Sequence, residues 1–510
     1  MKVLLMNFTQ KEVVKKLIRD GAKILYWVGK EQHFQNARDD KEYFSDTIFH
    51  NITDALKATP ADKIRDFKFS FPPKEIFRLI SDIQYQALEM ISRVDFTRQA
   101  AFNEKTDLFY QYVIYWYGVL KYFTPDVIIF TDIPHAGPSY VVYSLAKILC
   151  IKTVLYRFVK GFPSRLLFFT DFTDYSSLRS AYQEGLDSGV VWEDLSDEMK
   201  KYVQKQRQFN KSPNLSHAEH IDKLIKQGVK IPRDLLSWQA IMKNFKQGTL
   251  WRGVYNYFFM LGHRRQALAI GERNYSGLEL WWLYRKWKKA KQRYCKEYKS
   301  LQSEVDFSRK YIYVPLHLQP ECNTNPLGGI FDDQILMVRT IAAALPAGWM
   351  IYVKENPMQW LHYQGNFGRY DGYYKDLCAI QSVKLVPADT STFKLTASAQ
   401  TIATLTGSAG LEALVQLKPV LLFGFGWYMD CDGVLRVDDV VSCQRALHRI
   451  EMGYKPEEKK VFAFLQALDK VSIKGAFNKK YSQFSEIPIG EENSNNIANA
   501  LLKELGVIPT

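Results

Sequence analysis

The sequence predicts an α/β fold with two lobes that face a cleft, each built on a parallel β-sheet, and a helical insertion between them. Strand-like apolar segments alternate with helical segments in the first 175 residues, and the alternation returns after residue 306. This order is typical of parallel sheets whose strands are joined by crossover helices. A chain of 510 residues also exceeds what one hydrophobic core usually organises. We expect a first lobe over 1–175, a helical basic insertion and connector over 176–306, a second lobe over 307–490 and a closing helix over 491–510.

The first lobe is predicted from short apolar runs, each followed by a segment with helical periodicity. A long helical stretch, from about Pro73 to Tyr122, interrupts the alternation before it resumes. The expected strands are Lys2–Phe8, Lys23–Val28, Asp126–Thr131 and Lys152–Tyr156, and the expected helices include Gln10–Asp20 and Tyr140–Leu149.

The second lobe repeats the pattern. Its first strand, Lys310–Leu318, is followed by a helix over Asp332–Leu345. Further strands are expected at Gly348–Lys354, Gln381–Val386, Thr401–Thr406 and Val420–Phe425, with a short helix over Gly410–Leu417 and a last one over Ser494–Leu505.

The insertion carries most of the excess charge. The formal net charge is +14, and residues 241–300 alone hold 14 Lys and Arg against three acidic residues. A strongly basic helix with several tryptophans is expected over Ser276–Leu301. One basic patch on an otherwise nearly neutral chain indicates a local anionic partner and argues against a nucleic-acid track.

Composition points to a reduced compartment. The six cysteines show no CxxC spacing, so neither a zinc site nor a disulfide framework is expected. The apolar start of the chain is too short for a secretion signal and is predicted to be a strand. No run of 18 apolar residues occurs. We therefore expect a cytoplasmic protein.

The loop from Thr406 to Gly410 is the sharpest candidate for chemistry. A strand ends at Leu405, and Thr406, Gly407, Ser408, Ala409 and Gly410 then turn into a helix that carries Glu412. Small residues let the backbone approach a ligand, and the free N–H groups of a helix start attract anions. The alternative is an ordinary serine cap with a glycine turn.

Two further loops follow strands of the second lobe. The first carries Gln319 and Glu321, in a polar segment that could equally be a surface turn. The second carries Lys354 and Asn356. Lys354 could neutralise phosphate charge, and Asn356 offers a donor and an acceptor, although a lysine at a strand end is commonplace.

The first lobe contributes a fourth loop. Asp132 and His135 come directly after an apolar strand, and such a pair can serve as base, nucleophile or orienting group. The alternative is that Asp132 only caps a turn. Four charged residues that follow the next strand are candidates for the acceptor side of the cleft: Arg157, Arg165, Asp171 and Asp174.

A metal is not expected at any of these loops. The triplet Asp430-Cys431-Asp432 could hold a metal-bound diphosphate, but the neighbouring Asp438 and Asp439 favour a solvated acidic loop.

The segments KENP and TLTGSAGLEALVQLKPVLLFG resemble the C-terminal lobe of bacterial capsule and surface-polysaccharide glycosyltransferases of the GT-B fold, nearest to those that transfer Kdo from CMP-Kdo. The resemblance covers about 311–424 well and 126–174 more loosely. Thr406 and Ser408 match the hydroxyl motif that holds the CMP phosphate in these families, and Gln319-Pro320 resembles their QP element. Lys354 and Pro357 match a KEHP element whose histidine is Asn356 in this chain.

The resemblance implies two Rossmann-like lobes, with the acceptor on the first and a nucleotide-sugar on the second. It implies metal-independent transfer without a cofactor, from a CMP-activated donor of Kdo or a related acidic sugar to a glycan or lipid-linked acceptor. Asp132 and His135 would be the catalytic pair, Asp132 acting as base or as nucleophile. The basic aromatic segment 251–299 would then hold the enzyme on the anionic inner face of the membrane; the alternative is a solvated helix with buried tryptophans.

Two other functions remain open at this point. One is a different enzyme on the same architecture, a nucleotide-sugar 2-epimerase or a polyol-phosphate transferase. The other is a non-catalytic scaffold for glycan assembly at the membrane. A nucleotide that stabilises the protein would exclude the scaffold, and a requirement for an acceptor would exclude the epimerase.

Overall fold

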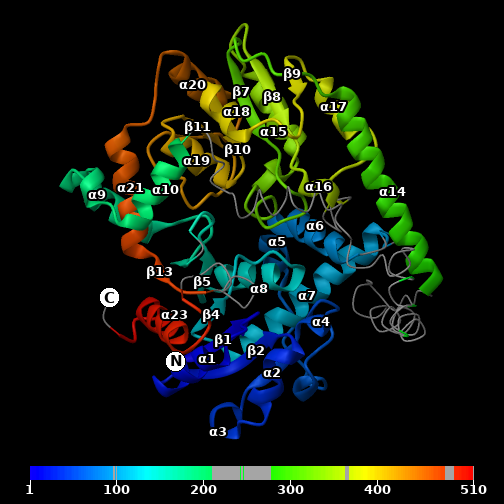
Figure 1. Ribbon diagram of the computed structural model, residues 1–510. Helices are drawn as coiled ribbons and strands as arrows, with labels where there is room; N and C mark the ends of the chain where they lie inside the picture. Colours follow the sequence, from blue (N-terminus) through cyan, green and yellow to red (C-terminus); the bar gives the residue numbers. More distant parts are fainter. Residues whose placement is uncertain are drawn as a thin grey trace. The chain divides into compact units, whose positions relative to one another are not determined.

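A computed structural model describes residues 1–95, 98, 100–162, 164–208, 242, 245, 248, 277–361, 367–476 and 487–508 (Figure 1). The chain forms two compact units. Unit 1 comprises 1–92, 100–190 and 463–510, and unit 2 comprises 93–99 and 191–462. The boundaries between the units differ from those expected for the lobes, because residues 463–510 belong to unit 1 together with the first part of the chain.

Unit 1 is built on a seven-stranded sheet in the order β13-β6-β5-β4-β1-β2-β3. The five strands β3, β2, β1, β4 and β5 run parallel to one another. Strand β6 is antiparallel to its neighbour β5, and β13 is antiparallel to β6. The strands are β1 (Lys2–Met6), β2 (Lys23–Gly29), β3 (Ile48–Asn51), β4 (Val127–Phe130), β5 (Lys152–Phe158), β6 (Arg165–Phe169) and β13 (Ile473–Lys474).

Helices cover both faces of this sheet. One face packs on α1 (Lys11–Arg19) and α23 (Glu491–Glu504), whose apolar residues share a core with Val3, Leu5 and Trp27. The other face packs on α7 (Phe102–Phe123) and α8 (Gly137–Ile148), with Tyr26 edge-on to Trp116. The remaining helices of unit 1 are α2 (Glu31–Arg38), α3 (Lys41–Phe44), α4 (Ile52–Ala55), η1 (Asp62–Ile64), α5 (Lys74–Ile80), η2 (Ser81–Ile83), α6 (Gln84–Val94) and α9 (Ser176–Ser188).

Unit 2 is built on a six-stranded parallel sheet in the order β12-β11-β10-β7-β8-β9. Numbered along the chain, this is the order 3-2-1-4-5-6 of a Rossmann-type sheet, with its switch point between β7 and β10. The strands are β7 (Tyr311–Pro315), β8 (Met350–Lys354), β9 (Val383–Leu385), β10 (Thr401–Thr404), β11 (Val420–Leu422) and β12 (Val434–Arg436). The predicted α/β class with Rossmann-like parallel sheets is confirmed.

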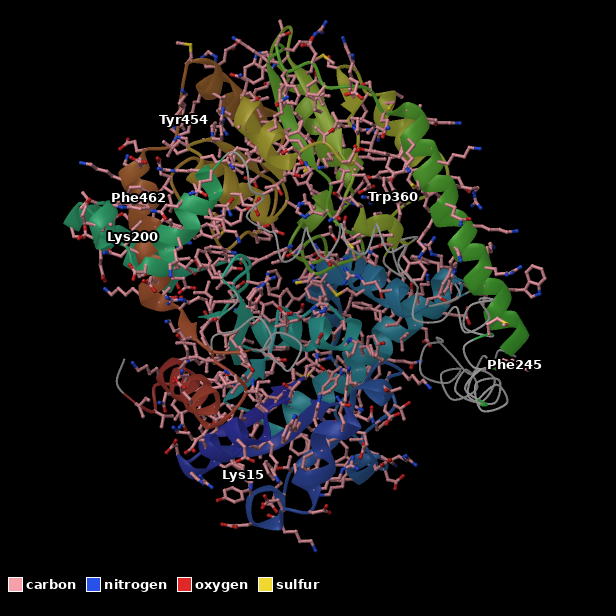
Figure 2. The ribbon with its side chains drawn as sticks, viewed as in Figure 1. Lys15, Lys200, Phe245, Trp360, Tyr454 and Phe462 are labelled. Atoms are coloured by element: carbon pink, nitrogen blue, oxygen red, sulfur yellow. The ribbon has the colours of Figure 1, made fainter. Side chains whose placement is uncertain are left out.

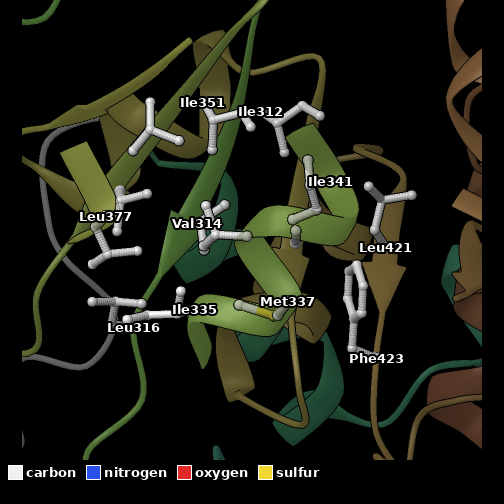
Figure 3. Close-up of a cluster of buried hydrophobic side chains, with 14 of the residues drawn as sticks. Ile312, Val314, Leu316, Ile335, Met337, Ile341, Ile351, Leu377, Leu421 and Phe423 are labelled. Carbon is white, nitrogen blue, oxygen red and sulfur yellow. The ribbon is translucent and has the colours of Figure 1, made fainter. Parts of the chain in front are cut away.

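One face of this second sheet buries aliphatic side chains. Ile312 and Val314 of β7 and Ile351 of β8 pack on α15 (Gln334–Ala343) and α17 (Tyr373–Cys378), as Figure 3 shows. The same core includes residues of α14 (Gly277–Leu301) and α20 (Val440–Glu451).

The opposite face carries tyrosines. Tyr311 of β7 donates a hydrogen bond to the carbonyl oxygen of Leu395 (2.8 Å) in α18 (Thr392–Ser398). The other helices of unit 2 are α10 (Asp197–Arg207), η3 (Trp192–Asp194), η4 (Gly329–Asp332), α16 (Met358–Leu361), α19 (Ser408–Val415) and α21 (Glu458–Val471), the last of which continues into unit 1.

Several predicted elements match the structure closely, and others were not foreseen. The basic helix expected over Ser276–Leu301 is α14, whereas the long helical stretch after Pro73 is divided into α5, α6 and α7. Residues 251–276 of the basic segment lie outside the described ranges. Strands β3, β6, β12 and β13 were not predicted. β3, β12 and β13 are short edge strands with weak apolar signals, whereas β6 lies between β5 and β13 and all five of its residues are buried.

Candidate functional site

The carboxyl edge of the unit 2 sheet gathers the predicted loops, as expected for a parallel sheet. At its switch point, β10 ends at Thr404 and the chain turns into α19 at Ser408. The amides of Ser408 and Ala409 and the Ser408 hydroxyl bond to no acceptor among the residues that the structure describes. Ser408 is half-buried. Three hydrogen-bond donors are therefore available at the start of a helix, where the helix dipole favours an anion.

The turn into α19 is held by a buried tyrosine. Tyr428 donates its hydroxyl proton to the carbonyl oxygen of Gly407 (2.6 Å). Burial raises the pKa of Tyr428, and the nearby Glu412 carboxylate raises it further, so the hydroxyl keeps its proton and acts as donor. A Cβ added at Gly410 would lie 2.2 Å from this hydroxyl, so Gly410 is required for the contact.

Thr406, predicted to bind the ligand, uses its hydroxyl within the protein. Its Oγ1 donates to the carbonyl oxygen of Asn323 (3.0 Å), which ties the turn to the loop after β7. The side chain is buried. Of the two hydroxyl residues predicted in this loop, Ser408 is the one that the structure leaves available.

Sequence reasoning missed His317, which lies at the switch point itself. Its Nε2 atom accepts a hydrogen bond from the backbone amide of Leu405 (3.1 Å) and lies 2.9 Å from Oγ1 of Thr404. The Thr404 hydroxyl oxygen in turn accepts from the amide of Gly407 (3.2 Å). The neighbouring strands β7 and β10 are separated by more than 80 residues in sequence, so only the Rossmann strand order could have brought this histidine to attention.

Gln319 lies beside this histidine but faces inward. Its side-chain oxygen accepts from Gln334 (3.0 Å) and from Arg369 (3.3 Å), and its side-chain nitrogen donates to the carbonyl oxygen of Asp332 (3.0 Å). The side-chain amide group thus holds the loop after β7 in place. Glu321 lies further along this loop, where it accepts from Asn323 (3.3 Å).

Lys354 and Asn356, at the end of β8, also make local contacts. Lys354 donates to the carbonyl oxygen of Thr390 (2.5 Å) and to the hydroxyl of Thr392 (3.1 Å), next to α18. The side-chain oxygen of Asn356 accepts from the amide of Met358 (3.0 Å) at the start of α16, whose Trp360 is labelled in Figure 2. Lys354 therefore ends β8, and β7 lies between this strand and β10, which Ser408 follows.

Unit 1 has its own candidate loop after β4. The Asp132 carboxylate accepts from the amide of Ile133 (2.7 Å), and Nδ1 of His135 donates to the carbonyl oxygen of the same residue (2.7 Å). Because a carbonyl oxygen can only accept, Nδ1 carries the proton, and Nε2 has the lone pair when the ring is neutral. Asp132 is half-buried and His135 is exposed, so one short turn presents a carboxylate and a basic nitrogen.

The charged residues after β5 are divided by the antiparallel strand β6. Arg157, the last residue but one of β5, lies at the same edge as Asp132, because Phe130 pairs with Leu155 in parallel register. Asp171 and Asp174 follow β6 and lie at the opposite edge, since Phe169 pairs with Leu155 in antiparallel register. Of the four candidates for the acceptor side, Arg157 and Arg165 therefore lie at the carboxyl edge of the sheet, and Asp171 and Asp174 lie at the opposite edge.

Arg165, Asp171 and Asp174 each have a local structural partner, which for Asp174 is the guanidinium group of Arg179 (2.7 Å). Arg165 is buried and paired with Asp469, and it donates to the carbonyl oxygen of Asp469 (3.1 Å). Burial alone would raise the pKa of Asp171. Hydrogen bonds from Thr173 and the ammonium group of Lys147 outweigh this effect, so the pKa of Asp171 lies below its ordinary value.

The acidic triplet is part of a turn. Asp432 accepts from the amide of Glu457 (2.6 Å) and from the hydroxyl of Tyr454 (3.3 Å), which Figure 2 labels. Burial raises the pKa of Cys431. In the part of the chain that the structure describes, no three His, Cys, Asp or Glu side chains are grouped as metal ligands. Within the same ranges, none of the helices has both the length and the apolar character of a membrane span.

The fold and this geometry define an α/β protein with two Rossmann-like units, one of which has a helix start with three available hydrogen-bond donors at its switch point. Residues 273–477, less than half of the chain, match the family described as "Capsule polysaccharide biosynthesis protein". The chain resembles the capsule-polysaccharide glycosyltransferases of the GT-B class. Curated proteins gave no match.

Solved structures give matches of low identity. One is the beta Kdo 2,7 transferase KpsC of Thermosulfurimonas dismutans, with 16% identity, a TM-score of 0.25, and coverage of 46% of this chain and 67% of that chain. Another is the UDP-GlcNAc 2-epimerase of Methanocaldococcus jannaschii, with 9% identity, a TM-score of 0.24, and coverage of 92% and 100%. A third is the spinosyn rhamnosyltransferase SpnG, with 9% identity, a TM-score of 0.23, and coverage of 92% and 95%.

Proposed function

We propose that the chain is a glycosyltransferase of bacterial surface-polysaccharide synthesis, which transfers a sugar from a nucleotide-activated donor to a glycan or lipid-linked acceptor. The observation that carries the proposal is the set of three available donors at the start of α19, at the switch point of a Rossmann-type sheet. The family match over 273–477 supports the link to capsule polysaccharide. A CMP-linked acidic sugar such as Kdo is the donor to test first, because Ser408 matches the hydroxyl motif of the Kdo enzymes.

The donor phosphate would bind the amides of Ser408 and Ala409 and the Ser408 hydroxyl. As the sugar leaves, negative charge grows on the phosphate, and preorganised amide donors stabilise that charge without reorganisation. This stabilisation needs no metal, so transfer is proposed to continue in the presence of EDTA. Glu412, on the first turns of α19, is proposed to contact the sugar or ribose of the donor.

Asp132 is proposed as the catalytic carboxylate, with His135 as its companion on the same turn. Both side chains bond to Ile133, so their orientation is set by one residue of the backbone. Asp132→Asn would keep the acceptor for the Ile133 amide but lose the basic oxygen. We expect it to retain nucleotide binding and to lose transfer by about a hundredfold or more. An active Asp132→Asn enzyme would remove Asp132 from this role.

A thermal-shift screen with CMP, CDP, UDP and GDP tests the donor site. A nucleotide present at 100 times its Kd stabilises a protein by about 2.7 kcal/mol, which is readily detected. Ser408→Ala should weaken the response. Ser300→Ala is the matched control, because Ser300 is exposed and its hydroxyl donates to the carbonyl oxygen of Glu297 in its own helix. If no nucleotide stabilises the wild-type protein, the proposed function fails.

The solvent-facing side of α14 is proposed to bind anionic lipid headgroups. The helix contains two acidic residues, Glu279 and Glu297. Glu297 bonds to the amides of Gly372, Tyr374 and Lys375 at α17. Trp282 is 60% exposed beside the cations of the helix, and a basic helix face with an exposed tryptophan suits a lipid interface. The exposed cations are Arg285, Lys286, Lys288, Lys289, Arg293, Lys296 and Lys299.

Liposome flotation tests this surface. The double variant Lys286→Glu with Lys289→Glu should release the protein from vesicles that contain anionic lipid. The matched control, Lys455→Glu with Lys459→Glu, makes the same charge change at exposed positions of unit 2 outside α14. Equal flotation of the two double variants would contradict a lipid-binding role for α14.

A further inference from the structure

We propose that His317 is a positioning residue for the donor-binding turn: its Nε2 atom supplies the acceptor that holds the end of β10 and thereby leaves the amides of Ser408 and Ala409 for the ligand. This inference rests on the proposed function and deepens it. It concerns a residue that touches the turn and not the donor itself.

The hydrogen bonds define the state of the ring. The amide of Leu405 points at Nε2 (3.1 Å), and a backbone N–H can only donate. Nε2 therefore carries a lone pair, which makes the ring neutral with its proton on Nδ1. Both Leu405 and Thr404 are fully buried, so no water replaces this acceptor.

Because Nε2 is an acceptor, the Thr404 hydroxyl must be the donor in its contact with the ring. The Thr404 hydroxyl, 2.9 Å from Nε2, shares the single lone pair of that atom with the Leu405 amide as a second donor, while its oxygen accepts from the amide of Gly407 (3.2 Å). The amide of Gly407 is thus used within the turn, and the next two amides remain available. A Cβ added at Gly407 would lie 2.8 Å from Cε1 of His317, so the ring and the turn are in contact.

The backbone of His317 is fixed from the other side. Gln334, at the start of α15, accepts from its amide (2.6 Å) and donates to its carbonyl oxygen (3.2 Å). Arg369 also donates to that carbonyl oxygen (3.3 Å), and its charge is neutralised by the buried Glu355. Because the backbone of His317 is held in this way, its imidazole has a fixed position from which it extends from the end of β7 to the end of β10.

Three variants separate the acceptor role from simple packing. Gln places a side-chain amide oxygen near the position of Nε2, Asn is one bond too short to reach it, and Leu fills space without an acceptor. We expect His317→Gln to bind the stabilising nucleotide within about threefold of the wild-type protein, whereas His317→Asn and His317→Leu lose about tenfold or more. Equal binding by Gln and Asn variants would overturn the inference.

Hydrogen exchange on the ligand-free protein provides a readout that does not depend on the nucleotide. The amides of Leu405 and Gly407 should exchange faster in the Asn and Leu variants and at the wild-type rate in the Gln variant. Unchanged exchange in all three variants would overturn the role of His317, even if nucleotides bind. Absence of nucleotide binding by the wild-type protein, with the expected exchange pattern, would overturn the proposed function and keep the positioning role.

Discussion

Arg369 and Glu355 form an ion pair in which both side chains have 0% exposure. Nε and Nη2 of the arginine donate to the two carboxylate oxygens over 2.7 and 3.0 Å, and the Tyr374 hydroxyl donates to one of these oxygens (2.6 Å). The same guanidinium group reaches the carbonyl oxygen of His317. The pair thus joins the ends of β8 and β7 beneath the candidate site.

Removing one partner of this pair should be costly. Arg369→Met leaves a buried carboxylate uncompensated, and we expect a loss of about 3–5 kcal/mol in the free energy of unfolding. Glu355→Gln should also destabilise the protein, and the double variant should lose less than the sum of the two. Denaturant unfolding, monitored by tryptophan fluorescence, measures the free energy of unfolding of each variant. Additive losses would show that the two residues do not depend on each other.

Gly410 and Tyr428 provide a steric test of the turn. In Gly410→Ala the new Cβ would meet the Tyr428 hydroxyl, so the tyrosine must move and release the carbonyl oxygen of Gly407. We expect a loss of stability of about 1–3 kcal/mol and weaker nucleotide binding. Gly426→Ala is the matched control, because its Cβ would meet the same tyrosine ring at 3.4 Å, an ordinary contact. Equal melting temperatures for the two variants would contradict the steric argument.

His50 makes the stability of unit 1 depend on pH. Burial lowers the pKa of His50 to about 4, although its hydrogen bond with the carbonyl oxygen of Thr59 (2.9 Å) opposes this shift. The unfolded chain, with an ordinary pKa of 6.5, then binds more protons than the native protein between these values. Stability is therefore complete above about pH 6.5 and falls as the pH decreases toward 4, by about 3 kcal/mol in total.

The His50→Gln variant isolates this contribution. Since glutamine does not titrate, the difference in unfolding free energy between wild type and variant should shrink from pH 7 to pH 4.5. A difference that stays constant over this range would show that His50 does not titrate as its burial implies.

Arg165 and Arg157 should respond differently to the same substitution. Arg165→Met leaves Asp469 without its buried partner, so we expect it to lower the stability of unit 1 by about 2 kcal/mol or more. Arg157 is only half-buried at the edge that carries Asp132, and Arg157→Met should change stability by less. Thermal unfolding of both variants checks the order, and a larger effect for Arg157 would reverse these roles.

Most of the architecture was predictable because apolar periodicity and strand-end loops are local signals. Thus Lys310–Leu318 and Thr401–Thr406 were predicted as strands that correspond to β7 and β10, and the loop with Ser408 was recognised from its small residues. What side chains do in those loops depends on partners distant in sequence. Gln319 and Thr406 looked available in the sequence, yet the structure uses both for internal hydrogen bonds.

In the first lobe, the positions of the four candidate acceptor residues depend on the direction of one strand. A reversal of strand direction at β6 leaves no clear sequence signal, and it moves Asp171 to the far edge of the sheet. His317 was missed for a related reason, because its importance follows from the adjacency of β7 and β10 and not from its own neighbours in sequence.

Unit 1 is completed by the last part of the chain, and this affects when it can fold. Strand β13 pairs with β6, and Asn493 of α23 bonds to Gln10 (2.9 Å) and to Ala476, all of them buried. During synthesis these partners emerge more than 270 residues after the first part of unit 1. Unit 2, apart from a few residues, is one continuous segment that emerges in between. The ribosome therefore delivers every residue of unit 2 before unit 1 can close its sheet, so unit 2 is expected to fold first.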